Sequence, residues 1–252
     1  MTGGARIFIT GSADGLGRLA AERLVHQKHR VVLHARNERR AQEALASVPG
    51  VEGVLVGDLS RVDAVKQLAA EANASGRFDA VIHNAGVYRA SGRDILAVNV
   101  LAPYVLTCLM HEPQRLIYLG SDEHWQGDPA LVRRLAEKGS CSYADSKLFV
   151  LLVAKAVARK WSDAYVNVVD PGWVPTKMGG RNAPDDLGKG VDTQAWLAVS
   201  TDREASVSGR YLHHGKEAEN LAAADDRTLQ EALLAACEQL SGVALPSRAR
   251  VL

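Results

Sequence analysis

The stretch "RIFITGSADGLG" (residues 6–17) runs from a short apolar segment into a glycine-rich turn, and an amphipathic segment follows it. Residues 6–10 predict a buried strand, and Leu16, Leu19 and Leu24 recur near the 3.6-residue period of a helix. Glycines between a strand and a helix allow a tight turn and a close approach of the backbone to a ligand. The start of the helix then offers N–H groups and a partial positive charge to a diphosphate. We therefore predict the first βα unit of a dinucleotide-binding sheet.

The spacing of these glycines is G-x-x-x-G-x-G, which differs from the G-x-G-x-x-G of the standard dinucleotide fingerprint. A glycine-rich turn that binds nothing is therefore an alternative. The place of the turn after the first strand favours binding, because phosphates bind at the first βα turn of doubly wound sheets. The residues expected to contact the cofactor here are Gly11, Ser12, Asp14, Gly15, Leu16 and Gly17.

The alternation of strand and helix continues along the chain. Short runs rich in Val, Ile and Leu recur at 30–35, 51–57, 79–84, 115–120, 165–170 and 209–214. Because these runs do not strictly alternate apolar and polar residues, they are typical of strands buried on both faces. Repeated βα units predict a parallel sheet covered on both sides. We expect the α/β fold class: one Rossmann-type domain over residues 1–252, doubly wound, with about seven strands and helices on both faces.

One segment breaks this pattern. Residues 171–190 contain three prolines and five glycines and directly follow a predicted strand. Long irregular segments in compact domains are usually binding loops or lids. Ligands of open α/β sheets bind beyond the carboxyl ends of the strands. We therefore expect a substrate lid loop at about 171–191.

The end of the second strand addresses the choice of cofactor. An acidic residue there would accept the ribose hydroxyls of NAD, but this chain has Arg36, followed by Asn37. A guanidinium suits a 2′-phosphate through paired hydrogen bonds, and Arg39 and Arg40 add positive charge. A solvated, basic helix start is the alternative interpretation. We predict NADP (NADPH) as the cofactor, with NAD as the second choice.

Bulk composition excludes several other classes. The chain has 252 residues and a formal net charge of +1, so neither a nucleic-acid nor a membrane partner is expected. The three cysteines form no C-x-x-C pair and the histidines form no H-E-x-x-H pattern, so we expect no metal site. The N-terminus shows no signal segment, and no window holds ~18 uncharged apolar residues. A reducing, cytoplasmic location is the simplest expectation.

The stretch "SYADSKLFVLLVAKAVA" (142–158) predicts a long apolar helix that carries Tyr143 and Lys147 four residues apart, on one face. A free phenol has a pKa of about 10, and a nearby cation could lower it by ~1–3 units. Such a phenol could pass a proton to or from an alcohol or carbonyl oxygen. Ser121, after the strand at 115–120, would supply a second hydrogen bond. The alternatives are an interfacial Tyr with a snorkelling Lys and a Ser that only caps a helix.

Together these residues resemble the short-chain dehydrogenase/reductase family over nearly the whole chain. The family's motifs occur in order as "TGSADGLG", "GDLS", "HNAGV", "AVNVLAPY", a lone Ser121, Y-x-x-x-K and "DPGWVPT". The positions that the resemblance adds are Asp58, Leu59, Asn84, Ala85, Gly86, Asn99, Pro171, Gly172, Val174 and Thr176. The resemblance implies that a small-molecule ketone or aldehyde and its alcohol are interconverted by hydride transfer.

The resemblance also implies residue roles. Tyr143 would be the general acid in reduction and the base in oxidation, and Lys147 would lower its pKa and bind the nicotinamide ribose. Ser121 would orient the substrate oxygen, and Asn99 would hold a water linking Lys147 to solvent. Other family positions would hold the cofactor: Asp58 and Leu59 near the adenine, and Thr176 with the backbone around Val174 at the carboxamide. A non-catalytic NADP(H)-binding regulator on the same fold is the main alternative, and an epimerase or dehydratase is disfavoured by the short chain.

The long interval between Ser121 and Tyr143 resembles the retinol-dehydrogenase-like branch of the family, although nothing in the chain supports a retinoid substrate. This interval would carry its own helical turn around Leu131 and Leu135. Residues Trp125, Trp173 and Met178 would give the pocket an apolar wall, or they only pack the loop. A homodimer or homotetramer is expected from the family, and the apolar run "LFVLLVAKAVA" suits burial against a partner or under the sheet equally well.

Overall fold

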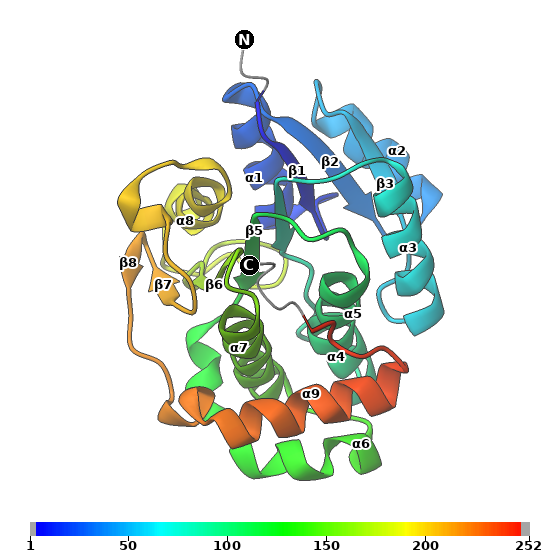
Figure 1. The fold of residues 1–252 in the computed structure, drawn as a ribbon. Coiled ribbons are helices and arrows are strands. Elements are labelled where there is room, and N and C mark those ends of the chain that lie inside the picture. The colour runs from blue at the N-terminus through cyan, green and yellow to red at the C-terminus, as the bar shows by residue number, and fades with distance from the viewer. Residues whose placement is uncertain (1–3, 248–252) are drawn as a thin grey trace.

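Within residues 4–247, which the computed structural model describes, eight strands form one sheet in the order β3-β2-β1-β4-β5-β6-β7-β8 (Figure 1). All neighbours pair in parallel except β7 and β8. The strands are β1 (Arg6–Ile9), β2 (Arg30–Ala35), β3 (Gly53–Val56), β4 (Ala80–His83), β5 (Arg115–Leu119), β6 (Tyr165–Asp170), β7 (Tyr211–His213) and β8 (Lys216–Glu217). The seven predicted strands are confirmed. The two-residue β8 is an additional antiparallel strand, and the predicted domain limits 1 and 252 lie outside the described residues.

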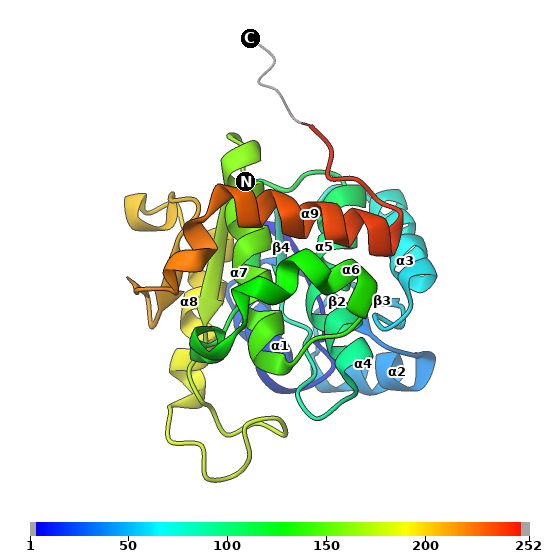
Figure 2. The same ribbon diagram turned by 90° about the horizontal axis from the view of Figure 1, so that it is seen from below.

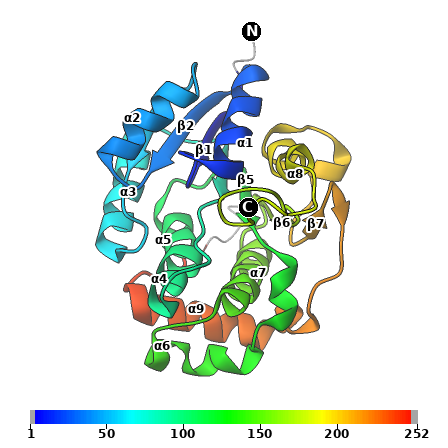
Figure 3. The same ribbon diagram turned by 180° about the vertical axis from the view of Figure 1, so that it is seen from behind.

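Helices cover both faces of the sheet, as the βα alternation predicted (Figures 1 and 3). Two separate apolar clusters form, one on each face. One face packs against α1 (Gly15–His26), α2 (Glu38–Ser47) and α8 (Leu187–Val199). The other packs against α3 (Val62–Ala74), α4 (Gly92–Leu96), α5 (Ala102–Leu109) and α7 (Tyr143–Lys160). The chain therefore has the doubly wound α/β architecture.

A further layer lies outside α7. Helix α9 (Arg227–Ser241) crosses α7 and α5, and the short α6 (Leu135–Lys138) lies beside it (Figures 1 and 2). Leu233 and Cys237 of α9 are fully buried in the cluster that holds the apolar side chains of α7. The phenol of Tyr104 in α5 donates to the Val243 carbonyl at 2.8 Å. The apolar run of α7 is thus covered by the sheet and by the chain's own last helix, and the expected homo-oligomer stays a prediction.

The segment between Ser121 and Tyr143 folds as predicted. It contains two 3₁₀ helices, Asp122–Gln126 and Pro129–Arg134, and then α6. Leu131 and Leu135 are buried in the same cluster as α9. This interval therefore gives α9 part of the surface against which it packs.

One continuous helical segment, Gly92–Leu109, has the length and composition of a membrane span, with a mean hydropathy of 1.3. It consists of α4, a π-helical turn at Ala97–Leu101, and α5. Because 67% of it is buried inside the protein, it has the character of a core helix. The π-helical turn breaks the regular hydrogen-bond ladder beside Asn99, and such turns are frequent at functional sites.

The parallel register brings the carboxyl ends of the central strands to one edge. β1 pairs with β4, β4 with β5, and β5 with β6, where Leu119 lies opposite Val169. Thr10, Asn84, Ser121 and Asp170 follow or end these strands. Residues far apart in sequence therefore meet at this edge, where doubly wound sheets bind their ligands.

The irregular loop after β6 runs from Pro171 to Asp186, and Figure 2 shows it projecting from the body of the protein. The predicted boundary of 171–191 is therefore one helical turn too long. Helix α8 begins at Leu187 because the Asp186 side chain caps it by accepting the Lys189 N–H at 2.9 Å. Trp173 N donates to the Asp185 carboxylate at 2.6 Å, and Asp185 N donates to Trp173 O at 3.1 Å. The loop is thereby closed at its base.

The close packing of the first turn generates a prediction. A Cβ at Gly17 would lie 2.4 Å from Asn84 Nδ2 and 2.7 Å from the Gly11 carbonyl oxygen. We expect Gly17→Ala to lower the free energy of unfolding by about 1–3 kcal/mol, because the overpacked turn must shift. The control is Gly53→Ala, since a Cβ at Gly53 meets nothing within 4 Å. Urea unfolding measures both variants, and equal stability of the two would contradict this prediction.

Candidate active site

The glycine turn is held in shape by local hydrogen bonds. Gly11 and Gly15 have φ values of 63° and 54°, in the left-handed region that favours glycine. The buried Ser12 hydroxyl donates to Ile9 O at 2.8 Å and accepts from His34 N at 2.9 Å. Asp14 begins α1 as its N-cap, with its carboxylate accepting the Gly15 N–H at 2.8 Å. The turn is therefore a fixed structure and not an open flexible loop.

His34 also holds this turn, although no sequence motif marks it. Its Nδ1 accepts from Gly11 N at 3.0 Å, and its Nε2 lies 2.9 Å from Gly57 O. This geometry requires a neutral ring that carries its proton on Nε2. Burial lowers the pKa of His34 to about 4, which keeps the ring neutral near pH 7. The one feature of the sequence that could have indicated this role is that His34 is a polar residue within a predicted buried strand.

The segment after β4 is tied to the same turn. Asn84 Nδ2 donates to Thr10 O at 2.9 Å and to Gly11 O at 3.2 Å. The Ala85 N–H donates to the Thr10 hydroxyl at 3.1 Å, and a Cβ on Gly11 would lie 2.8 Å from Ala85 Cα. The predicted Asn84, Ala85 and Gly86 therefore lie directly beside the glycine turn. The structure gives Asn84 a positioning contact, and its contact with cofactor stays a prediction.

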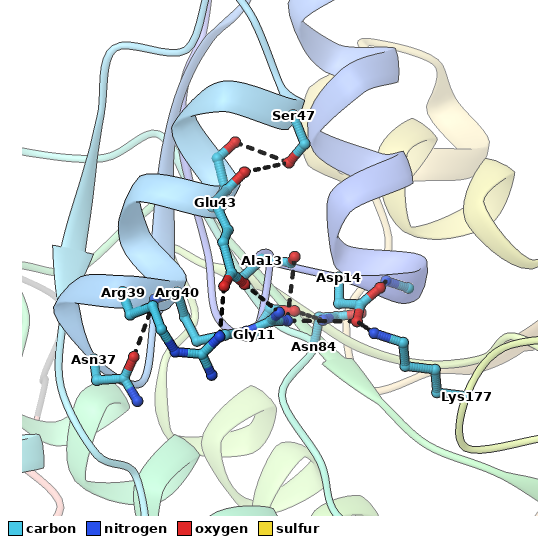
Figure 4. A network of polar contacts seen from close by, with 12 residues as sticks. Gly11, Ala13, Asp14, Asn37, Arg39, Arg40, Glu43, Ser47, Asn84 and Lys177 are labelled. Atoms are coloured by element: carbon cyan, nitrogen blue, oxygen red, sulfur yellow. Dashed lines mark hydrogen bonds and ion pairs between the residues drawn. The ribbon is translucent and has the colours of Figure 1, made fainter.

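The loop after β6 reaches back to the first turn (Figure 4). Lys177 forms an ion pair with Asp14, and Arg40 Nη2 lies 3.4 Å from the same carboxylate. The hydrogen bond from Lys177 is the main cause that lowers the pKa of Asp14. Gly15 lies close to Thr176, since a Cβ at Gly15 would lie 4.0 Å from Thr176 Cγ2. The two predicted halves of the cofactor site, near Gly15 and near Thr176, therefore meet.

The residues beyond β2 and β3 lie farther along the carboxyl edge of the sheet. Arg36 is exposed and forms no hydrogen bond or ion pair with the other described residues, although its charge acts on Asp58. Burial alone would raise the pKa of Asp58, but hydrogen bonds from Ser60 and the nearby arginines lower it overall. The Asn37 side chain accepts from Arg40 N at 3.0 Å and so caps α2. Its carboxamide oxygen thus already has a structural partner.

These residues fit a dinucleotide. The left-handed Gly15 has open space beside it, because a Cβ at this position would approach no described residue more closely than Thr176. Gly15 N and Arg18 N already donate to Asp14, but the N–H groups of Leu16 and Gly17 in the first turn of α1 are available to a ligand. Arg36 and Arg40 supply positive charge, and Lys177 offsets the charge of Asp14. A phosphate-bearing ligand is therefore compatible with the donors and charges present.

Tyr143, Lys147 and Ser121 come together, as predicted. Tyr143 is the first residue of α7, which Ser142 and Asp145 begin with a reciprocal capping box. Lys147 is 6% exposed, and its Nζ donates to Leu119 O at 2.8 Å and lies 5.3 Å from the centre of the Tyr143 ring. Ser121 lies close enough to the Tyr143 phenol to act on its pKa, and its hydroxyl donates to Asp122 Oδ1 and accepts from Glu123 N, both at 3.2 Å. Ser121 therefore caps the 3₁₀ helix, and its role towards a substrate oxygen stays a prediction.

The predicted effect of Lys147 on Tyr143 is not what the structure shows. The pKa of Tyr143 is raised, chiefly by burial and then by the negative charges of Glu123 and Asp170. The Lys147 ammonium lies over the ring face and is bonded to a carbonyl, so it does not reach the phenolic oxygen. A raised pKa keeps the phenol protonated at neutral pH, as a proton donor requires.

Asn99 lies at the π-helical turn and is 2% exposed. Its Oδ1 accepts from Val87 N at 2.8 Å, and its Nδ2 donates to Val87 O and to Ser146 Oγ, both at 3.0 Å. The side chain therefore joins the segment after β4 to α7. The link from Asn99 through a water to Lys147 stays a prediction.

An exposed aromatic ring and an exposed thioether lie beside the Tyr143 phenol. The Tyr88 ring meets the Tyr143 ring edge-on at 4.8 Å between centroids, and Met178 Sδ lies 4.0 Å from the phenolic oxygen. Trp173, in the same loop as Met178, is 59% exposed, and Trp125 follows Ser121 by four residues. Exposed apolar groups gathered in this way mark a binding surface. Tyr88 was missed in the sequence because no motif there signals it.

Two further polar residues near the site were not predicted from the sequence. Asp170 ends β6 and is 6% exposed, and its carboxylate accepts from the Tyr211 phenol and from Gly172 N, both at 2.9 Å. His124 is 1% exposed, bonds Ser121 O through Nδ1 at 2.7 Å, and accepts from Leu221 N through Nε2 at 3.1 Å. His124 therefore links the Ser121 backbone to the segment at Leu221 and helps to fix the position of Ser121. Among the described residues no group of three or more His, Cys, Asp or Glu could hold a metal ion.

Comparisons with known proteins identify relatives of this chain. A family model described as short chain dehydrogenase matches residues 5–110. An uncharacterized oxidoreductase of Emericella nidulans is 46% identical, over 96% of this chain and 98% of the relative. A short-chain dehydrogenase of Gibberella zeae is 42% identical, over 96% and 99%. Retinol dehydrogenase 14 of Mus musculus is 29% identical, over 95% and 86%.

Solved structures share the fold. An uncharacterized protein of Mycobacterium paratuberculosis superposes with a TM-score of 0.80 at 22% identity, over 96% of this chain and 95% of that chain. A protein of Shigella flexneri 2a, described as a short chain dehydrogenase and solved in complex with NADP, gives a TM-score of 0.66 at 22% identity, over 84% and 97%. At these identities the likeness concerns the fold alone.

The buried His34 generates a prediction about acid stability. Its folded pKa is lowered from 6.5 to about 4, so between these pH values the unfolded chain binds a proton that the native protein excludes. The free energy of unfolding should therefore fall as the pH drops from 6.5 towards 4, by about 2 kcal/mol at pH 4.5 from this residue. In His34→Gln this part of the loss should vanish. Urea unfolding at pH 4.5 and pH 7 measures it, and an unchanged pH dependence in the variant would refute the assignment.

Proposed function

Since the chain belongs to the short-chain dehydrogenase family, in its retinol-dehydrogenase-like branch, we propose that it is an NADP(H)-dependent oxidoreductase. It would interconvert a ketone or aldehyde and the corresponding alcohol, with reduction as the favoured direction. The observation that supports this most directly is the meeting of Tyr143, Ser121 and Lys147 at the carboxyl edge of the sheet, beside the glycine turn.

The proposed chemistry assigns one task to each of these residues. Bound NADPH supplies the hydride, which the protein does not contain. Tyr143 donates its phenolic proton to the substrate oxygen in reduction and takes it back in oxidation. The Ser121 hydroxyl holds that oxygen, and Lys147 contributes a positive charge under the Tyr143 ring. The raised pKa of Tyr143 supports the role of proton donor.

The residues that follow β2 support NADP over NAD as the cofactor. Arg36 stands where an acidic residue would accept the ribose hydroxyls of NAD, and it has no ion-pair partner among the described residues. Arg40 lies nearby, although it also pairs with Glu43 at 2.7 Å. The protein of Shigella flexneri with the same fold was solved with NADP.

The surroundings of Tyr143 support an aromatic or broadly apolar carbonyl compound as substrate. Tyr88 and Met178 present an exposed ring and a thioether beside the phenol, and the exposed Trp173 lies in the same loop as Met178. Asp122 and Glu123 are exposed acidic residues directly after Ser121. Negative charge at this position disfavours an anionic substrate such as a 2-oxo acid. We therefore propose a neutral aryl ketone or aldehyde.

Other expectations remain part of the proposal. We propose a cytoplasmic protein without nucleic-acid or membrane partners, and a homodimer or homotetramer as its assembly. The cover of α9 over α7 means that any such assembly needs a surface other than the apolar face of α7. The main alternative, a non-catalytic NADP(H)-binding regulator, is disfavoured because Ser121, Tyr143 and Lys147 are all present and adjacent.

The decisive experiment follows NADPH oxidation with paired carbonyl substrates. We expect turnover of methyl phenylglyoxylate, a neutral aryl ketone, and at least ~10-fold lower kcat/KM for phenylglyoxylate, its anionic partner. Tyr143→Phe should lower kcat at least ~100-fold because the proton donor is lost, while NADPH binding measured by fluorescence is retained. Binding of NADPH without turnover across aryl and alkyl carbonyls would favour the regulator instead.

The cofactor choice has its own test. Arg36→Asp should lower kcat/KM with NADPH and raise it with NADH, because a carboxylate repels the 2′-phosphate and accepts the ribose hydroxyls. We expect the NADPH/NADH preference to change at least ~100-fold. Arg39→Asp is the matched control, since Arg39 is exposed on α2 and already pairs with Glu43 at 2.7 Å. Equal preference in wild type and Arg36→Asp would exclude Arg36 as the residue that selects the phosphate.

A further inference from the structure

The ammonium of Lys147 is buried at the centre of the site with little to neutralise it. The residue is 6% exposed, and its Nζ donates to the neutral carbonyl of Leu119. Burying an ammonium is costly unless an opposite charge or several hydrogen bonds replace its water. Burial accordingly lowers the pKa of Lys147 to about 8, so the residue is close to losing its charge at physiological pH. The site therefore needs a counter-charge.

The backbone places one carboxylate on the same side of the sheet as Lys147. Along β6, Val168 faces the α7 cluster and Val169 faces the opposite cluster. Because side chains alternate along a strand, Asp170 points to the α7 side, at the carboxyl edge of the sheet. Leu119, which accepts the Lys147 hydrogen bond, pairs with Val169 in the neighbouring strand. Asp170 and the Lys147 ammonium thus lie at the same level of the sheet, on the same face.

The carboxylate of Asp170 is itself fixed. Tyr211 of β7 donates to Oδ2 at 2.9 Å, Gly172 N donates to Oδ1 at 2.9 Å, and His213 Nδ1 lies 3.6 Å from Oδ2. The residue is 6% exposed. Tyr211 and Gly172 therefore fix the positions of both carboxylate oxygens of this buried residue. The carboxylate is therefore held by contacts that do not involve Lys147, with which it forms no direct ion pair.

We propose that Asp170 is the counter-charge of Lys147, a positioning residue that keeps the ammonium protonated beneath Tyr143, with Tyr211 holding the carboxylate in place. The role in catalysis rests on the proposed function, but the charge pair itself does not. Asp170 is the first residue of the stretch "DPGWVPT", but that motif gave it no role, because its chemistry depends on the strand pairing.

Other titratable groups face the same space from the surrounding elements. Tyr143 lies on α7, Asp122, Glu123 and His124 lie in the segment after β5, and Tyr211 and His213 lie on β7. The charge that acts on the Lys147 ammonium is that of Asp170, which raises the lysine pKa against the effect of burial. Asp122 and Glu123, which are both exposed, raise the pKa of Tyr143, as Asp170 also does, but they do not act on Lys147. Asp170 is therefore the group to vary.

The test is a double-mutant cycle of stability against pH. A lysine with a lowered folded pKa binds its proton more tightly in the unfolded chain, so stability rises with pH from the folded pKa of about 8 up to 10.5. In Asp170→Asn this rise should start roughly one pH unit lower. Each proton that only the unfolded state binds changes the unfolding constant about tenfold per pH unit. Urea unfolding from about pH 6 to pH 10 measures the curves.

The controls isolate the pair. In a Lys147→Met background, Asp170→Asn should leave the pH dependence between about 6 and 10 unchanged, because no lysine charge remains to be stabilised. Asp122→Asn, which removes an exposed carboxylate, should not shift the start of the rise in the wild-type background. An equal effect of Asp170→Asn with and without Lys147, or no effect in either, overturns the proposal.

A kinetic measurement gives a second readout and covers the case in which Lys147→Met fails to fold. The alkaline limb of kcat/KM for carbonyl reduction should move to lower pH by roughly one unit in Asp170→Asn and by less in Glu123→Gln, because Glu123 acts on Tyr143 but not on Lys147. Tyr211→Phe keeps the charge and should move the limb less. An unmoved limb in Asp170→Asn contradicts the proposal. If the wild type reduces no carbonyl, the proposed function fails, and the unfolding cycle still decides whether Asp170 and Lys147 are coupled.

Discussion

The parallel pairing of β1, β4, β5 and β6 is the constraint on which the site depends. Each of these strands ends at the same edge of the sheet. The strand pairing therefore determines which residues lie next to the polar residue at each strand end. Thr10 and Asn84 thereby meet although a long stretch of sequence separates them. A one-residue slip in any of these pairings would turn its side chains to the opposite face and dissolve the site. The chemistry at the edge is thus a consequence of strand register.

Two different solutions to burying polar groups appear around this edge. His34 is kept neutral, and its two ring nitrogens are both used to hold backbone groups of adjacent turns. Lys147, by contrast, is useful only while it is charged, so it requires a carboxylate that other residues hold in place. The first solution gives rigidity. The second gives Lys147 a charge that depends on the groups around it.

Sequence patterns predicted the architecture well because burial on both faces leaves a clear signature in short runs of Val, Ile and Leu. The glycine turn and the Y-x-x-x-K pair were predicted for the same kind of reason, since their spacing alone encodes the local geometry. Asp170, Tyr88 and Lys177 could not be predicted, because their roles arise from contacts between distant segments. The direction of the Tyr143 pKa was predicted wrongly, because sequence shows a nearby cation but not burial or the carboxylates of neighbouring strands.

The last helix has a consequence for how the chain is made. Helix α9 comes after every other element and completes the core over α7. Until residues 227–241 have left the ribosome, the nascent chain carries an uncovered apolar helix surface. Such surfaces attract chaperones and other unfinished chains during synthesis. Shortening the C-terminus should therefore impair yield and solubility in the cell well before it touches any group at the edge of the sheet.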